Sequence, residues 1–146
     1  MINKWDERFL FLAKIISSWS KDPSTKVGAI IVKDNRIVTT GYNGFPPNIL
    51  DSEERLNNRE LKYKYICHAE ANSIIQCCNT GTSCNGADIY IYPFGPCIEC
   101  SKLIIIAGIK RVIFPKIPVD LEKRWGESIY FAKNLISEAG LKIDEY

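Results

Sequence analysis

Two short motifs hold the residues best suited to chemistry, Cys67-His68-Ala69-Glu70 and Pro96-Cys97-Ile98-Glu99-Cys100, with 25 residues between Glu70 and Pro96. His68 is the only histidine of the chain. Cys97 and Cys100 are three positions apart, so on a helix both thiols project from one face of its first turn. One imidazole and two thiolates suit zinc, and three protein ligands leave the fourth position to water, as in catalytic zinc sites. The sequence therefore predicts one catalytic Zn²⁺ ion bound by His68, Cys97 and Cys100.

Glu70 is the candidate catalytic residue. It lies two positions after His68, which is roughly 200° around a helix, so both side chains reach one target only beyond the start of that helix. Two helices would then direct their N-termini at one point, where their positive ends favour thiolate over thiol. A carboxylate beside the ion that does not bind it is suited to moving protons to and from a water molecule.

Composition predicts a single domain over residues 1–146. The chain is 46% hydrophobic and 25% charged, and at this length a core forms without disulfides or a structural metal. Lys and Arg total 19 against 17 for Asp and Glu, so the basic excess of a duplex-binding protein is missing and no nucleic acid partner is expected. The charged start and short apolar runs predict neither a signal peptide nor a membrane span.

The chain contains six cysteines. Without a secretory signal they favour reduced thiols and a cytoplasmic location, in the host cytoplasm if the gene is viral. Cys-x-x-Cys also occurs as a redox pair, and that reading of Cys97 and Cys100 stays open here. The other four cysteines are read as small buried hydrophobes or as ligands of a second zinc ion: Cys67, Cys77, Cys78 and Cys84.

Hydrophobic periodicity predicts the elements that position these motifs. A first helix carries its apolar stripe on Trp5, Phe9, Leu12, Ile16 and Trp19, and residues 27–32 and 37–40 form a hairpin that is apolar on both faces. Residues 48–64 are polar and are expected to form a surface loop. A helix over 68–78 buries Ile74, Ile75 and Cys78. Strands over 87–92, 112–114 and 141–143 then alternate with helices over 97–107 and 121–138. This order predicts an α/β fold, a three-layer α/β/α sandwich around a mixed five-stranded sheet.

The motifs His-x-Glu and Pro-Cys-x-x-Cys resemble the signature of the zinc-dependent cytidine deaminase superfamily. The segments 20–28, 41–46, 67–70 and 107–110 are similar to its deoxycytidylate deaminase branch. This resemblance implies hydrolysis of dCMP to dUMP and ammonia, which supplies thymidylate synthesis. In that reaction Glu70 would pass the proton of water to N3 of the base as hydroxide attacks C4, and would then protonate the departing amine. It also implies a homohexamer, activated by dCTP and inhibited by dTTP.

The resemblance places Asn43 at the sugar or base of the substrate and makes Gly44, Phe45 and the following loop candidates for effector binding. Lys26, in a loop with Ser24 and Thr25 before the first strand, is the candidate for the substrate phosphate. Two other functions remain open. One is a deaminase of tRNA adenosine, cytosine, cytidine or dCTP, and the other is a non-catalytic, zinc-stabilised nucleotide sensor.

Overall fold

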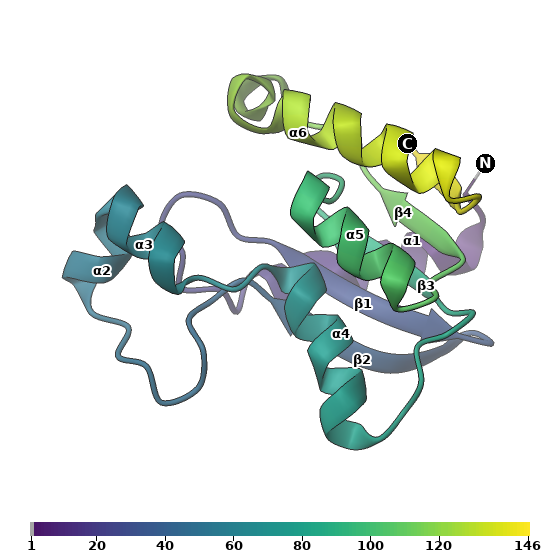
Figure 1. The fold of residues 1–146 in the computed structure, drawn as a ribbon, viewed down its shortest axis with the longest axis horizontal. Coiled ribbons are helices and arrows are strands. Elements are labelled where there is room, and N and C mark those ends of the chain that lie inside the picture. Colours follow the sequence, from purple (N-terminus) through teal and green to yellow (C-terminus); the bar gives the residue numbers. More distant parts are fainter. Residues whose placement is uncertain (1) are drawn as a thin grey trace.

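A mixed five-stranded sheet with the order β2-β1-β3-β4-β5 forms the centre of the computed structural model, which describes residues 2–146 (Figure 1). β1 pairs antiparallel with both β2 and β3, whereas β3, β4 and β5 run parallel. The strands are β1 (Gly28–Lys33), β2 (Arg36–Tyr42), β3 (Asp88–Tyr92), β4 (Arg111–Phe114) and β5 (Lys142–Glu145).

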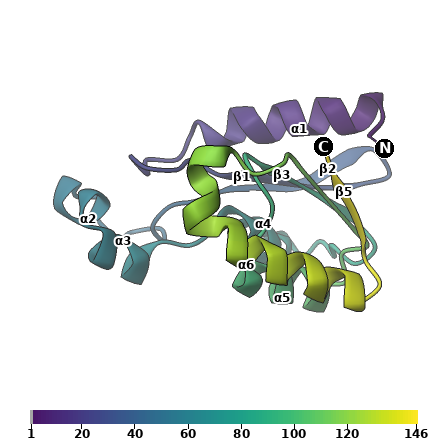
Figure 2. The same ribbon diagram turned by 90° about the horizontal axis from the view of Figure 1, so that it is seen from above.

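Helices cover both faces of this sheet, which confirms the predicted three-layer sandwich (Figure 2). α1 (Lys4–Ser17) lies on one face, and α4 (Ala69–Thr80), α5 (Ile98–Ile106) and α6 (Val119–Glu138) lie on the other. No helix of residues 2–146 combines the length and the apolar character that crossing a lipid bilayer requires.

The hairpin is apolar on both faces because a separate core lies on each side of it. Ile30 and Val32 pack with Phe9 of α1. Ala29 and Ile31 point the other way, into the core formed with α4, α5 and α6. Alternate side chains of a strand point to opposite faces, so one short segment serves both cores.

Two glycines set how closely helices approach the hairpin. A Cβ at Gly28 would lie 2.2 Å from the backbone oxygen of Ala13 in α1. A Cβ at Gly41 would lie 2.4 Å from the backbone oxygen of Ala69 and 2.5 Å from the nitrogen of Ser73 in α4. Only glycine permits such contacts, so the two positions fix which face of each helix meets the sheet.

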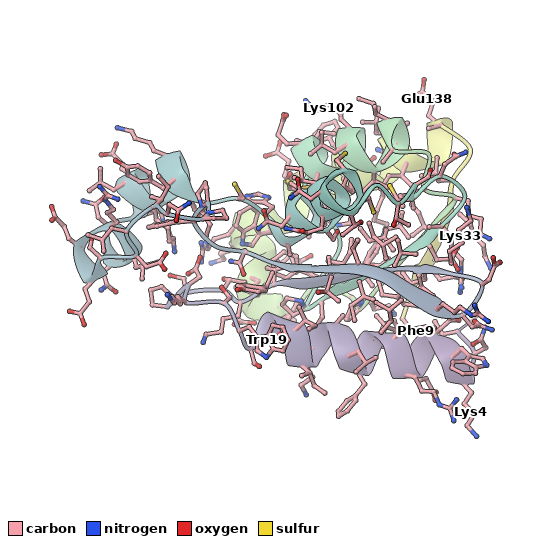
Figure 3. All side chains as sticks on the ribbon, turned by 90° about the horizontal axis from the view of Figure 1, so that it is seen from below. Lys4, Phe9, Trp19, Lys33, Lys102 and Glu138 are labelled. Carbon is pink, nitrogen blue, oxygen red and sulfur yellow. The ribbon has the colours of Figure 1, made fainter. Side chains whose placement is uncertain are left out.

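The predicted apolar stripe of α1 is partly wrong. Phe9 and Ile16 are buried as expected, but Trp5 is 45% exposed and Trp19 is 58% exposed. Figure 3 shows Phe9 on the sheet side of α1 and Trp19 at the end of the helix. The helix turns Asp6, Ala13 and Ser17 inward instead. The close approach at Gly28 requires small side chains at Ala13 and Ser17, and Asp6 accepts hydrogen bonds from Arg111 and Tyr90.

The predicted core face of α4 is also displaced. Ile75 is 51% exposed and Cys78 is exposed, and only Ile74 packs partly against the core. The inward face is formed by Ala69, Glu70, Ser73 and Cys77. The contact at Gly41 selects the small residues of this face, and it turns Glu70 inward with them.

The polar segment predicted as a loop contains two short helices, α2 (Glu53–Asn57) and α3 (Arg59–Tyr65), which extend beyond one end of the sheet (Figure 1). The Ser52 side chain accepts a hydrogen bond from the backbone of Arg55 at the start of α2, and the Asn58 side chain accepts one from Leu61 at the start of α3. These caps stabilise turns whose apolar periodicity is too weak to predict a helix.

Candidate active site

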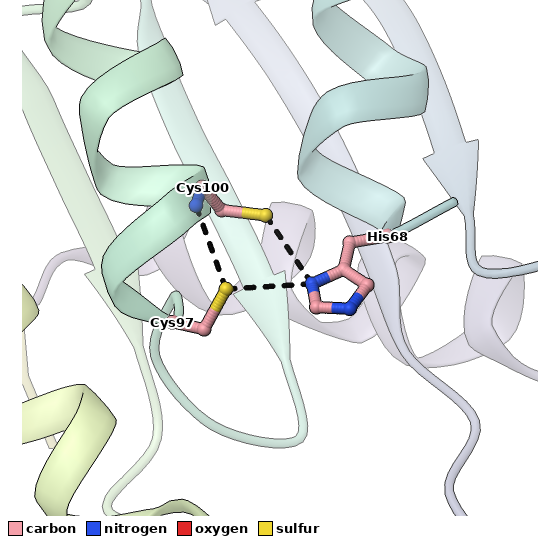
Figure 4. Close-up of side chains that lie close together, drawn as sticks. All are labelled: His68, Cys97 and Cys100. Carbon is pink, nitrogen blue, oxygen red and sulfur yellow. Dashed lines mark hydrogen bonds between the residues drawn. The ribbon is translucent and has the colours of Figure 1, made fainter. Parts of the chain in front are cut away.

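The N-termini of α4 and α5 converge on three side chains from the two motifs (Figure 4). His68 is the N-cap of α4, and its ring makes no capping hydrogen bond, so it is free to turn toward α5. Cys97 is the N-cap of α5. His68 Nδ1 lies 3.4 Å from Sγ of Cys97 and 3.4 Å from Sγ of Cys100.

These separations fit a zinc ion. Bonds of about 2.3 Å to sulfur and about 2.0 Å to nitrogen in a tetrahedral site leave neighbouring ligand atoms roughly 3.5 Å apart. Within residues 2–146 this is the one group of three or more potential ligands with all donor atoms within 4.8 Å of one another. The remaining cysteines lie outside it: Cys77 and Cys84 are buried, Cys78 is exposed and Cys67 is half-buried.

Glu70 is buried beside this cluster, at 4% exposure. Burial raises the pKa of its carboxyl to about 7, although the nearby His68 charge and a hydrogen bond with Cys100 oppose the rise. A carboxyl with such a pKa exchanges protons readily near neutral pH. The position of Glu70, in contact with one thiol of the cluster, is that of a group able to pass protons to a molecule bound there.

The thiols of the cluster differ in pKa. A hydrogen bond from Cys100 lowers the pKa of Cys97 to about 4, and His68 adds to this effect. The same hydrogen bond raises the pKa of Cys100, which donates it. The hydrogen bond to Cys97 raises the pKa of His68 to about 8. The cluster thus stabilises negative charge on sulfur at the start of α5, as a metal-binding thiolate requires.

A pocket opens onto the cluster. His68, Glu70 and Cys97 form one wall, and other parts of its lining come from the loop before β1, from α3 and from α6. Asn43 lines this pocket, whereas Lys26 is exposed and is not among its lining residues. Asn43 therefore shares a pocket with His68 and Cys97, whereas Lys26 does not.

The amide of Asn43 holds the loop before β1. Its Oδ1 accepts a hydrogen bond from the Val27 backbone at 2.8 Å, and its Nδ2 donates to the Thr25 carbonyl at 2.9 Å. Ser20 Oγ donates to the Asn43 carbonyl. Asn43 thus gives one wall of the pocket its shape, and direct contact with a substrate stays a prediction.

Sequence reasoning missed several pocket residues. Lys62 of α3 is 3% exposed and forms a 2.9 Å ion pair with Asp22, which is 6% exposed. Arg124 and Trp125 of α6 also line the pocket, and Arg124 donates a hydrogen bond to the Tyr63 hydroxyl at 3.0 Å. No sequence signal marked these residues, because α3 lacks apolar periodicity and Trp125 resembles any core tryptophan.

The predicted effector residues lie at a second cavity. Gly44 and Phe45 line an empty volume of about 430 Å³ together with Trp19 and Asp51. The backbone of Gly44 pairs with Cys67, the residue before His68. This cavity therefore adjoins the segment that carries the zinc cluster.

Residues 3–116 match the family model described as the cytidine and deoxycytidylate deaminase zinc-binding region. The chain belongs to the cytidine and deoxycytidylate deaminase family. It is 43% identical over 143 residues to a protein of Aliivibrio fischeri named as an uncharacterized deaminase in the luxG 3' region, covering 98% of this chain and 94% of the relative. It is 44% identical over 117 residues to human deoxycytidylate deaminase, covering 76% of this chain and 64% of the human protein.

Solved structures of the family share the fold. The dCMP deaminase of cyanophage S-TIM5, in complex with dCMP and dUMP, superposes with a TM-score of 0.79 at 24% identity, covering 100% of this chain and 99% of the other. The resemblance inferred from the motifs is confirmed, and so is the fold. The match to the family model ends at residue 116, so α6 and β5 lie beyond the zinc-binding region shared across the family.

Proposed function

We propose that this protein is a zinc-dependent enzyme that hydrolyses dCMP to dUMP and ammonia, within the single domain 1–146. The observation that carries the proposal is the cluster of His68, Cys97 and Cys100 with Glu70 buried beside it. The relatives named deoxycytidylate deaminase support dCMP as the substrate.

The three ligands would hold one zinc ion, which when bound supplies a water molecule of lowered pKa as the nucleophile. Glu70 accepts a proton from that water and delivers it to N3 of the cytosine ring, which makes C4 easier to attack. As the water oxygen bonds to C4, Glu70 takes the second proton of that oxygen and carries it to the amino group. The C4–N bond then breaks, ammonia leaves and the oxygen stays as the C4 carbonyl of dUMP. Burial supports this role, because it brings the pKa of Glu70 near neutrality and allows both transfers.

Asn43 and Lys26 are proposed to contact the substrate, Asn43 from the pocket wall after β2 and Lys26 from the loop before β1. Gly44 and Phe45 are proposed to bind nucleotide effectors in the adjoining cavity, with dCTP activating and dTTP inhibiting. By the same resemblance the protein is a cytoplasmic homohexamer that supplies dUMP for thymidylate synthesis. Light scattering after size-exclusion chromatography measures the assembly directly.

The test is release of ammonia from dCMP by purified protein of known zinc content, with and without dCTP and dTTP. We expect one zinc per chain, formation of dUMP, a higher rate with dCTP and a lower rate with dTTP. Cys100→Ala should lose both zinc and turnover, whereas Cys78→Ala, a matched control at an exposed cysteine outside the cluster, should keep both. Protein that binds one zinc but forms no dUMP would contradict the proposed substrate.

A further inference from the structure

Two buried polar atoms in the lining of the pocket have no partner. Trp125 Nε1 and Thr25 Oγ1 are shielded from solvent and make no hydrogen bond in the described structure, and both residues line the pocket. Leaving a buried polar atom unpaired costs free energy. Two such atoms in one pocket indicate that a bound molecule completes their hydrogen bonds. A third unpaired atom, Asp88 Oδ1, belongs to a different region, 3.9 Å from Lys110 Nζ.

The Trp125 ring is held in place by its neighbours. It stacks on Phe94 with ring centroids 6.0 Å apart, and it meets the His68 ring edge-on at 6.3 Å. Ser128, one turn later on α6, accepts a hydrogen bond from the backbone of Ile98 at the start of α5. α6 is therefore fixed to the helix that carries Cys97, and the indole N–H is positioned rather than mobile.

Thr25 is fixed by contacts within the loop before β1 and with Asn43. Its backbone nitrogen donates to Asp22 Oδ1 and its carbonyl accepts from Asn43 Nδ2. Because both backbone groups are engaged, the hydroxyl is the one polar group of Thr25 without a partner. Trp125 can only donate a hydrogen bond, whereas the Thr25 hydroxyl can donate or accept.

The pocket also has a cation without a carboxylate partner. Lys62 is neutralised by Asp22, but no acidic group of residues 2–146 forms an ion pair with Arg124. One terminal nitrogen of its guanidinium donates to Tyr63 Oη, and the other donors remain available. A guanidinium with free donors is well suited to a phosphate dianion, which accepts two parallel hydrogen bonds.

We propose that α6 and the loop before β1 recognise the nucleotide, with Arg124 binding its 5'-phosphate and with Trp125 Nε1 and Thr25 Oγ1 bonding to its nucleoside part. The assignment follows the position of each group. Trp125 contacts His68 and so lies at the reacting end of the pocket, whereas Arg124 is exposed and lies where a charged phosphate remains partly hydrated. The inference rests on the proposed function, since that function makes a nucleoside monophosphate the substrate.

The first experiment measures KM and kcat for dCMP in Arg124→Gln, Arg124→Lys and the matched control Lys123→Gln. Lys123 is the exposed neighbour of Arg124 and does not line the pocket. We expect Arg124→Gln to raise KM by roughly tenfold to a hundredfold, the usual weight of a hydrogen bond to a charged group, with kcat nearly unchanged. Arg124→Lys should recover part of the loss, and Lys123→Gln should behave as wild type. Equal KM values in Arg124→Gln and Lys123→Gln would overturn the proposal.

Lys26→Gln provides a direct comparison of the two cations suggested for the phosphate. A rise in KM for Lys26→Gln without one for Arg124→Gln would assign the phosphate to Lys26 and refute the role of Arg124.

Trp125→Phe keeps the ring but removes the N–H, and Thr25→Val keeps the shape but removes the hydroxyl. Each should raise KM for dCMP and the inhibition constant of dUMP about fivefold, as expected for one neutral hydrogen bond. Unchanged constants in both variants would show that neither atom meets the ligand.

Calorimetric titration with dUMP separates this inference from the proposed function, because it needs no turnover. Protein that fails to deaminate dCMP but binds dUMP, with weaker binding in Arg124→Gln, would refute the activity and keep the recognition site. Protein that deaminates dCMP with the same constants in every variant would keep the activity and refute the recognition site. Wild-type protein that binds no dUMP would refute the recognition site as well.

Discussion

Two buried polar clusters lie toward opposite ends of β3 and β4, and they differ in where their polar groups find partners. At the N-terminal ends of these strands, Asp6 accepts hydrogen bonds from Arg111 at both carboxylate oxygens and from the Tyr90 hydroxyl. Arg111 also reaches Asp144 at 2.6 Å. In this first cluster Asp88 Oδ1 makes no hydrogen bond, but Arg111 lies 3.6 Å from the other oxygen of that carboxylate. The second cluster follows the C-terminal end of β3 and contains His68, Glu70 and the thiols, together with the two unpaired atoms of the pocket.

This difference in hydrogen bonding distinguishes polar groups that stabilise the fold from polar groups that are available to bind a ligand. Both carboxylate oxygens of Asp6 accept hydrogen bonds within the chain. Removal of a partner therefore leaves a buried charge unpaired and lowers the free energy of unfolding. The pocket instead keeps a carboxyl of raised pKa and unpaired donors, which gain partners only when a molecule binds. We therefore expect substitutions in the first cluster to change stability, and substitutions in the second to change activity.

The largest effect should come from Glu70→Gln, which keeps the shape of the side chain but cannot carry a proton. We expect kcat for dCMP to fall by roughly 10²- to 10⁴-fold, the usual contribution of a general acid–base group. Zinc content and melting temperature should stay near wild-type values. Glu99→Gln, at an exposed carboxylate of α5, is the control. Retained turnover in Glu70→Gln would contradict its role. Wild-type protein that responds to nucleotide binding but shows no turnover would favour the non-catalytic sensor.

Arg111→Ala should give the largest loss of stability. It leaves the carboxylates of Asp6 and Asp144 without their main partner, and such a change in a buried pair costs about 3–5 kcal/mol. The control Lys142→Ala removes a cation that is 61% exposed and lies 3.2 Å from Asp144, and it should cost below about 1 kcal/mol. Urea denaturation measures both. Equal midpoints for the two variants would show that the Arg111 network does not stabilise the fold.

Tyr90→Phe should have a smaller effect, because Asp6 keeps Arg111 as a partner. The lost hydrogen bond is 2.7 Å long and meets a charged oxygen, so we expect destabilisation by about 1.5 kcal/mol. KM and kcat for dCMP should not change, since the Tyr90 side chain packs against α1, on the face of the sheet opposite α4 and α5. A change in kcat with unaltered stability would reverse the roles assigned to the two clusters.

The smallest effect concerns pH. Burial alone would raise the pKa of Asp144, but hydrogen bonds from Arg111 and Lys142 outweigh it and lower that pKa to about 2. A carboxyl whose folded-state pKa is depressed stabilises the protein above its unfolded pKa, which is near 4, and this contribution is lost as pH falls. We expect urea midpoints to decline between about pH 4 and pH 2, and to decline less steeply in Asp144→Asn. Parallel pH profiles for the two proteins would exclude this contribution.

Much of the fold was predictable, because the main elements follow from local pattern. The hairpin, the three later strands and the four large helices all occur close to the predicted positions. The two wrong helix faces share one cause. Periodicity favours the largest apolar residues, which are Trp5 in α1, Trp19 just beyond its end and Ile75 in α4. The close contacts at Gly28 and Gly41 instead require small residues where the helices meet the hairpin. The sequence of a helix does not show which of its residues will contact a strand that is distant in the chain.

The sequence by itself predicted which side chains form the cluster, since residue type and spacing in His-x-Glu and Pro-Cys-x-x-Cys already indicate one imidazole, two thiols and a carboxyl beside them. The tertiary structure alone decided what surrounds it. Lys62, Arg124 and Trp125 reach the pocket from segments that are distant in sequence, and Lys26 is left outside its lining. Ligand geometry at a metal is local and therefore readable from spacing, whereas the walls of a pocket depend on how α3 and α6 pack over the sheet, which no local pattern encodes.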